Sequence, residues 1–88
     1  MPSLLRIEKD AIEARVLDII EEFLDYVAGY KAEITRETSF TDLKADWFEV
    51  VEIVMELAEE FKIETYIPQE MPIKVGDVID WVVESYSA

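Results

Sequence analysis

Carboxylates are the most numerous reactive side chains in the stretch from residue 46 to residue 60. Four glutamates recur at three- and four-residue steps, a spacing that gathers them on one side of a helix: Glu49, Glu52, Glu56 and Glu59. Such a face can steer a basic partner. The acids Glu52, Glu56 and Glu59 are also spaced to share a divalent cation such as Ca²⁺. Because charged helix faces are usually solvated, we do not expect a specific metal site. Apolar groups within this acidic face, described below, favour a docking face instead.

The sequence lacks the side chains on which most hydrolytic and transition-metal chemistry depends. It contains no cysteine and no histidine. Disulfides, thiol nucleophiles and imidazole bases are therefore excluded, together with the usual zinc ligands. We expect a protein that is not an enzyme and that uses neither a metal ion nor a cofactor.

The glutamates belong to an amphipathic helix that is predicted to begin at about residue 47 and end near 61. Asp46 is suited to the N-cap, and Glu49, three residues later, completes a capping-box pattern. On the side away from the glutamates, the helical angles bring together the apolar residues Trp47, Val50, Val54, Leu57, Ala58 and Phe61.

Three large apolar side chains of this helix bear on its function. The angle of Trp47 permits inward packing, while its place at the helix start permits an outward role as an interface anchor, and both readings stay open. Phe48 and Met55 fall among the glutamates, which predicts outward contact with a partner. The predicted partner-binding residues are Asp46, Trp47, Phe48, Glu49, Val51, Glu52, Met55, Glu56 and Glu59.

Two further helices are predicted from apolar residues at three- and four-residue steps, near residues 5–28 and 75–86. The first has Leu5, Ile12, Val16, Ile19, Ile20, Phe23, Leu24 and Val27, and the last has Val75, Val78, Ile79, Val82 and Val83. Gly29 is a plausible stop for the first helix. Between the first two helices, Ile34, Phe40 and Leu43 should pin a polar loop to the core. A single turn of helix is expected at 68–71, before Pro72.

Length and charge limit the class of protein and of partner. Eighty-eight residues make one small domain, 1–88, and 51% of them are hydrophobic, enough to build a core. A net charge of −13 opposes nucleic acid and anionic lipid and favours a basic protein surface. No apolar run is long enough to cross a bilayer, and the N-terminus does not read as a signal peptide. We expect a cytoplasmic monomer.

The stretch from Leu43 to Phe61 resembles the second helix of the acyl carrier proteins. The resemblance rests on Leu43, Ala45, Asp46, the run Val51-Glu52-Ile53-Val54-Met55, Leu57 and Glu60-Phe61. Thr38-Ser39-Phe40 resembles the loop before that helix, and Lys74 to Trp81 resembles the closing helix. Trp47 stands where the family has the serine that carries 4′-phosphopantetheine. Lys44 stands where the family usually has glycine, and Phe48 where it has leucine.

The resemblance implies an all-α fold, a small four-helix bundle with three principal helices and a short third helix. It implies a binding module without the phosphopantetheine arm, whose partner is an acyl-chain synthase or acyltransferase. The alternative is a carrier of fatty-acid or polyketide synthesis whose attachment serine is replaced in this chain. Ser39 and Thr41 are the nearest preceding hydroxyls, and either would need a shift in register to take the place of the serine.

Overall fold

The computed structural model describes residues 6–28, 33–66 and 74–87, which contain three helices. These are α1 (Arg6–Ala28), α2 (Trp47–Phe61) and α3 (Val75–Ser87). The three predicted principal helices are confirmed, with bounds within one residue of those expected. Gly29 and the expected turn of helix at 68–71 lie outside the described residues. In the described ranges there is no strand, only an isolated antiparallel bridge between Ser39 and Lys74.

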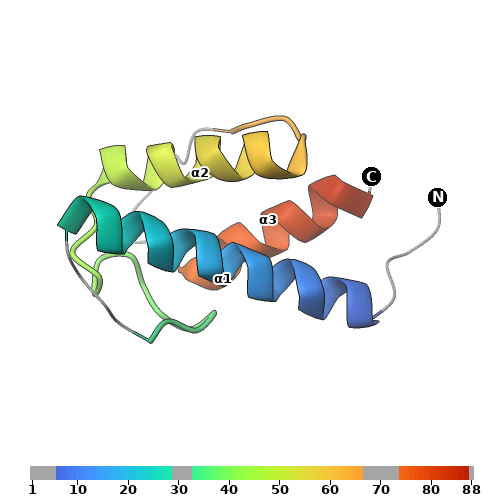
Figure 1. Ribbon diagram of the computed structural model, residues 1–88, viewed down its shortest axis with the longest axis horizontal. Coiled ribbons are helices and arrows are strands. Elements are labelled where there is room, and N and C mark those ends of the chain that lie inside the picture. Colours follow the sequence, from blue (N-terminus) through green and yellow to red (C-terminus); the bar gives the residue numbers. More distant parts are fainter. Residues whose placement is uncertain (1–5, 29–32, 67–73, 88) are drawn as a thin grey trace.

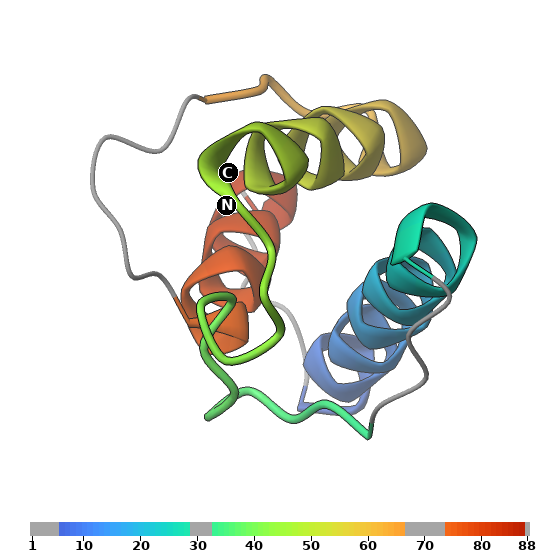
Figure 2. The same cartoon turned by 90° about the vertical axis from the view of Figure 1, so that its left-hand side faces the viewer.

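The helices pack against one another in all three pairings. In Figure 1, α1 runs against the direction of α2 and α3, which point the same way. Seen from the end, the three helices stand at the corners of a triangle, with the loop that precedes α2 running across the open end (Figure 2). None of the described helices is long and apolar enough to cross a membrane.

The core is apolar and draws on all three helices and on the loop before α2. Ile34, Phe40 and Leu43 are buried, which confirms that this loop is pinned to the core. Ile53, which was not among the predicted core residues, is fully buried, whereas Phe61 is only partly buried and packs edge-on against Tyr86. The other buried core residues are Ile12, Val16, Ile19, Ile20, Leu24, Ala45, Val50, Val54, Leu57, Ala58, Val75, Val78, Ile79 and Val82.

The loop before α2 is fastened to the start of α3 by backbone contacts. The Val75 N–H donates to the Thr38 carbonyl and the Gly76 N–H to the Arg36 carbonyl, each at 2.8 Å. A β-carbon at Gly76 would lie 2.8 Å from the Arg36 carbonyl oxygen, so the close approach requires glycine. The loop thus satisfies N–H groups that the first turn of a helix leaves unpaired.

The Arg36 side chain adds a second tie between the same loop and two helices. Its guanidinium donates to Glu13 of α1 at 2.9 Å and to Asp80 of α3 at 2.6 Å. The hydrogen bond and charge of Asp80, followed by the charge of Glu13, raise the pKa of Arg36 above its ordinary value. These contacts hold the loop that leads into α2 against the rest of the bundle.

Candidate functional site: the start and outer face of α2

The start of α2 is held by a complete capping box. The Glu49 N–H donates to the Asp46 carboxylate at 2.8 Å, and the Asp46 N–H donates to the Glu49 carboxylate at 3.0 Å. This confirms the predicted N-cap. Both carboxylates are therefore occupied in fixing the helix start, so Glu49 has a structural task besides any contact with a partner.

The turn that enters α2 contains a residue in the left-handed backbone region. Lys44 has φ 59°, and its N–H donates to the Thr41 carbonyl at 3.0 Å. Its neighbour Ala45 is buried, while the Lys44 side chain is exposed. A residue with a β-carbon adopts this backbone conformation at a cost in free energy, so glycine would be favoured over lysine at this position.

The first turn of α2 presents two aromatic side chains at the surface. Trp47 is 39% exposed and Phe48 is 70% exposed, and their rings meet edge to face with centroids 5.2 Å apart. Trp47 lies between the inward and the outward alternatives, because 39% of its surface is exposed and the rest is covered. The outward direction of Phe48 is confirmed, as is that of Met55, which is 57% exposed. Val51 is half-buried between the two faces.

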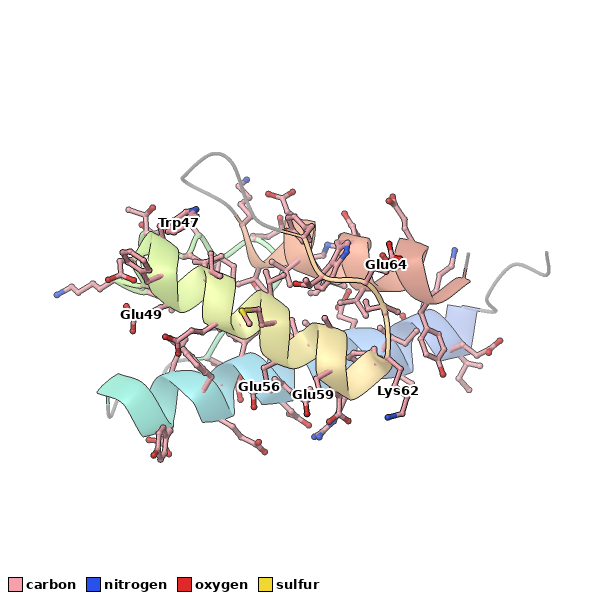
Figure 3. The ribbon with its side chains drawn as sticks, turned by 90° about the horizontal axis from the view of Figure 1, so that it is seen from above. Trp47, Glu49, Glu56, Glu59, Lys62 and Glu64 are labelled. Carbon is pink, nitrogen blue, oxygen red and sulfur yellow. The ribbon has the colours of Figure 1, made fainter. Side chains whose placement is uncertain are left out.

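The five glutamates of α2 divide by their contacts. Glu49 caps the helix, and Glu60 accepts a hydrogen bond from Arg15 of α1 at 3.3 Å. The other three are exposed and take part in none of the ion pairs found in the described part of the chain. We call these three the acid strip: Glu52, Glu56 and Glu59. Figure 3 shows Trp47 and Glu49 at the start of α2, Glu56 and Glu59 along its later turns and Lys62 at its end.

The described residues contain no group of three or more acidic side chains placed to hold a metal ion. The calcium alternative for the acid strip therefore has no geometric support. Ser39, the nearest serine before α2, is half-buried; its hydroxyl oxygen accepts a hydrogen bond from the Thr41 N–H at 3.1 Å, and its backbone is bridged to Lys74. This hydroxyl is tied into the loop rather than presented at the start of α2.

Comparison with known proteins identifies the family. A curated acyl carrier protein from Porphyromonas gingivalis is 38% identical over 73 residues, which cover 81% of this chain and 90% of the relative. The acyl carrier protein of a second strain of that species matches to the same extent. The chain belongs to the acyl carrier protein family. No family profile matches the sequence, and no solved structure matches it.

Membership of the acyl carrier protein family accounts for the helical bundle and for the amphipathic α2. Both relatives are named as carriers rather than as enzymes. Trp47, at the start of α2, has an indole ring with one N–H and no hydroxyl. Lys44, three residues before it, holds a conformationally demanding position, since its φ of 59° lies in the left-handed region.

Proposed function

We propose that this chain is an acyl carrier protein-like binding module without a 4′-phosphopantetheine arm, which docks through α2 on a basic protein partner. The observation that carries the proposal is the start of α2, where a capped helix presents the exposed Trp47 in place of a hydroxyl. The tryptophan in place of a hydroxyl residue is not accompanied by loss of the helix. The same helix keeps the exposed acid strip, so a charged docking face persists beside the altered residue.

The different contacts of the α2 acids support assigning docking to three of them. Glu49 caps α2 and Glu60 is paired with Arg15, whereas the acid strip projects into solvent. Exposed carboxylates attract a basic surface over a range of roughly 8–10 Å at physiological salt. Their main effect on binding is therefore expected in the association rate.

The absence of the arm is tested by incubation with a phosphopantetheinyl transferase and coenzyme A. The intact mass should stay unchanged, because Trp47 cannot be phosphopantetheinylated. A gain of the phosphopantetheine mass would refute the proposal, and Ser39→Ala would then show whether Ser39 is the attachment point. Trp47→Ser restores the hydroxyl: modification of this variant would show that the enzyme still recognises the surrounding surface.

The docking face is tested by charge reversal. Affinity capture from the native cell identifies bound proteins, among which we expect acyl-chain synthases or acyltransferases. The variant Glu52→Lys/Glu56→Lys should slow association with such a protein and flatten its salt dependence. The matched control is Glu21→Lys/Asp25→Lys, which reverses two exposed acids with the same four-residue spacing on α1. Equal effects of the two double variants would show that only net charge matters.

A further inference from the structure

Two aromatic side chains meet at the start of α2, and we call this pair the aromatic tip: Trp47, which is 39% exposed, and Phe48, which is 70% exposed. The rings contact each other at an interplanar angle of 75°, and the helix that bears them is fixed by its capping box. Trp and Tyr side chains in this kind of setting are frequent anchors of interfaces, because they bury much surface while losing little conformational freedom. The tip is thus built to contact an apolar surface.

The apolar character continues from the tip along one line of α2. Phe48 and Met55 are seven residues apart, which brings them to the same face of the helix, separated by about 10 Å along its axis. Glu52 lies between them in sequence and is exposed. A partner that covers this line must therefore accept apolar groups and carboxylates at alternating positions.

The charges at the two ends of α2 give the surface a direction. Lys44 precedes the tip and Lys62 follows the last turn, both exposed and both in the left-handed backbone region. Between them α2 has only acidic charges. Along α2, the surface therefore begins with the cation Lys44, continues with the aromatic tip and the acid strip, and ends with the cation Lys62. A net charge of −13 repels a second copy of the chain, which leaves a different protein as the occupant.

We propose that Lys44, Trp47 and Phe48 together anchor the chain in an apolar pocket of a partner protein, with a partner carboxylate facing Lys44 and partner Lys or Arg side chains facing the acid strip. This proposal rests on the proposed function and specifies the chemistry of its partner. A uniformly basic partner surface would place a cation beside the pocket, and that cation would repel Lys44. The partner surface should therefore be acidic next to the pocket and basic opposite the acid strip.

The probes for the test are 16-residue peptides selected from a random displayed library against the full-length protein at physiological salt. We expect the enriched peptides to combine apolar residues with Lys or Arg and to carry an Asp or Glu. Their Kd should rise about tenfold or more for Trp47→Ala and for Phe48→Ala. Tyr26→Ala removes an exposed aromatic from α1 and should leave Kd unchanged.

The two lysines supply a matched pair. Lys44→Glu should weaken binding several-fold, while Lys62→Glu, which makes the same charge change in the same backbone conformation at the other end of α2, should have a smaller effect. Urea unfolding of each variant checks that the fold is intact. In a Trp81→Phe background, the fluorescence of Trp47 alone should be protected from acrylamide by bound peptide, a readout that needs no change in the tip.

The outcomes separate this proposal from the one on which it rests. If no peptide is enriched, or if enriched peptides bind Trp47→Ala and Phe48→Ala as well as the unaltered protein, the anchor is wrong. If those peptides are nevertheless lost with Glu52→Lys/Glu56→Lys, acidic docking stands without the anchor. If the tip variants lose binding but the charge reversal does not, the anchor stands and acidic docking is wrong. If Lys44→Glu and Lys62→Glu weakened binding equally, the inference that a partner carboxylate faces Lys44 would be wrong.

Discussion

Replacing Lys44 by glycine should stabilise the protein. Lys44 adopts φ 59°, where its β-carbon is too close to the following carbonyl. For an ordinary residue this conformation costs roughly 1–2 kcal/mol. Glycine removes that cost but loses more freedom on folding, which offsets about 0.5–1 kcal/mol. With the midpoints of these two ranges, the free energy of unfolding should therefore rise by about 0.5–1 kcal/mol.

Thermal and urea unfolding, followed by circular dichroism, measure the change. For a domain of this size, about 1 kcal/mol corresponds to roughly 4–8 °C, so Tm should rise by about 2–8 °C. The control is Lys44→Ala, which removes the same charge and the same long side chain but keeps the β-carbon. The gain of the glycine variant over the alanine variant isolates the backbone effect.

Two results would contradict this reasoning. If Lys44→Ala were as stable as Lys44→Gly, the β-carbon would not be the source of strain. If both were less stable than the unaltered protein by the same amount, the lysine side chain would make a stabilising contact that outweighs its backbone. Lys44→Asn gives an intermediate case, because asparagine tolerates the left-handed region better than lysine does, and it should fall between the alanine and glycine variants.

Other substitutions test the assignment of core, loop and surface. Phe48→Ala should change the free energy of unfolding by less than about 0.5 kcal/mol because Phe48 is exposed, whereas Phe40→Ala should cost about 3–5 kcal/mol because Phe40 is fully buried; urea unfolding distinguishes them. Arg36→Met should cost about 0.5–2 kcal/mol by removing one partly buried and one exposed ion pair, a loss that should shrink at high salt. Burial, and then the charge of Asp77, raise the pKa of Tyr66. Below a pH of about 10, Tyr66 is protonated in the folded and in the unfolded protein, and above it the unfolded protein loses the proton first. The free energy of unfolding should therefore fall as the pH rises above about 10. This fall should be smaller in Tyr66→Phe than in the control Tyr26→Phe, which keeps Tyr66.

The helices were predictable because their apolar residues are local and periodic. Val16 and Ile20 in α1, and Val78 and Val82 in α3, are four residues apart and lie on single faces that the bundle buries. The cap of α2 was predictable for the same reason, since its two partners are three residues apart in sequence. A short-range pattern is enough wherever the contact itself is short-range.

The position of Trp47 shows where a helical projection fails. Its angle groups it with Val50 and Val54, but an angle carries no information about height along the axis. Trp47 begins the helix, and it stays 39% exposed although Val50 and Val54 of the same arc are fully buried. Ile53 shows the opposite error: it lies at the edge of the apolar arc and is fully buried, because the neighbouring helices cover a wider face than the projection assigned to the core.

The contacts that fasten the loop before α2 could not be predicted from the sequence. Arg36 is one of three basic residues between α1 and α2, and its partners Glu13 and Asp80 are far from it in the chain. Gly76 reads locally as a residue that opens a helix, yet its lack of a side chain serves the approach of the Arg36 carbonyl. No local spacing encodes either requirement.

The joint between this loop and α3 determines how the molecule would bear tension. The hydrogen bonds from Val75 to Thr38 and from Gly76 to Arg36 connect the segment before α2 with the segment after it. A pull applied at the start of α1 and the end of α3 would be transmitted across these bonds and the Arg36–Asp80 ion pair, bypassing α2. The helix that bears the aromatic tip and the acid strip therefore lies outside this hydrogen-bonded route and is connected to it by its packing against α1 and α3.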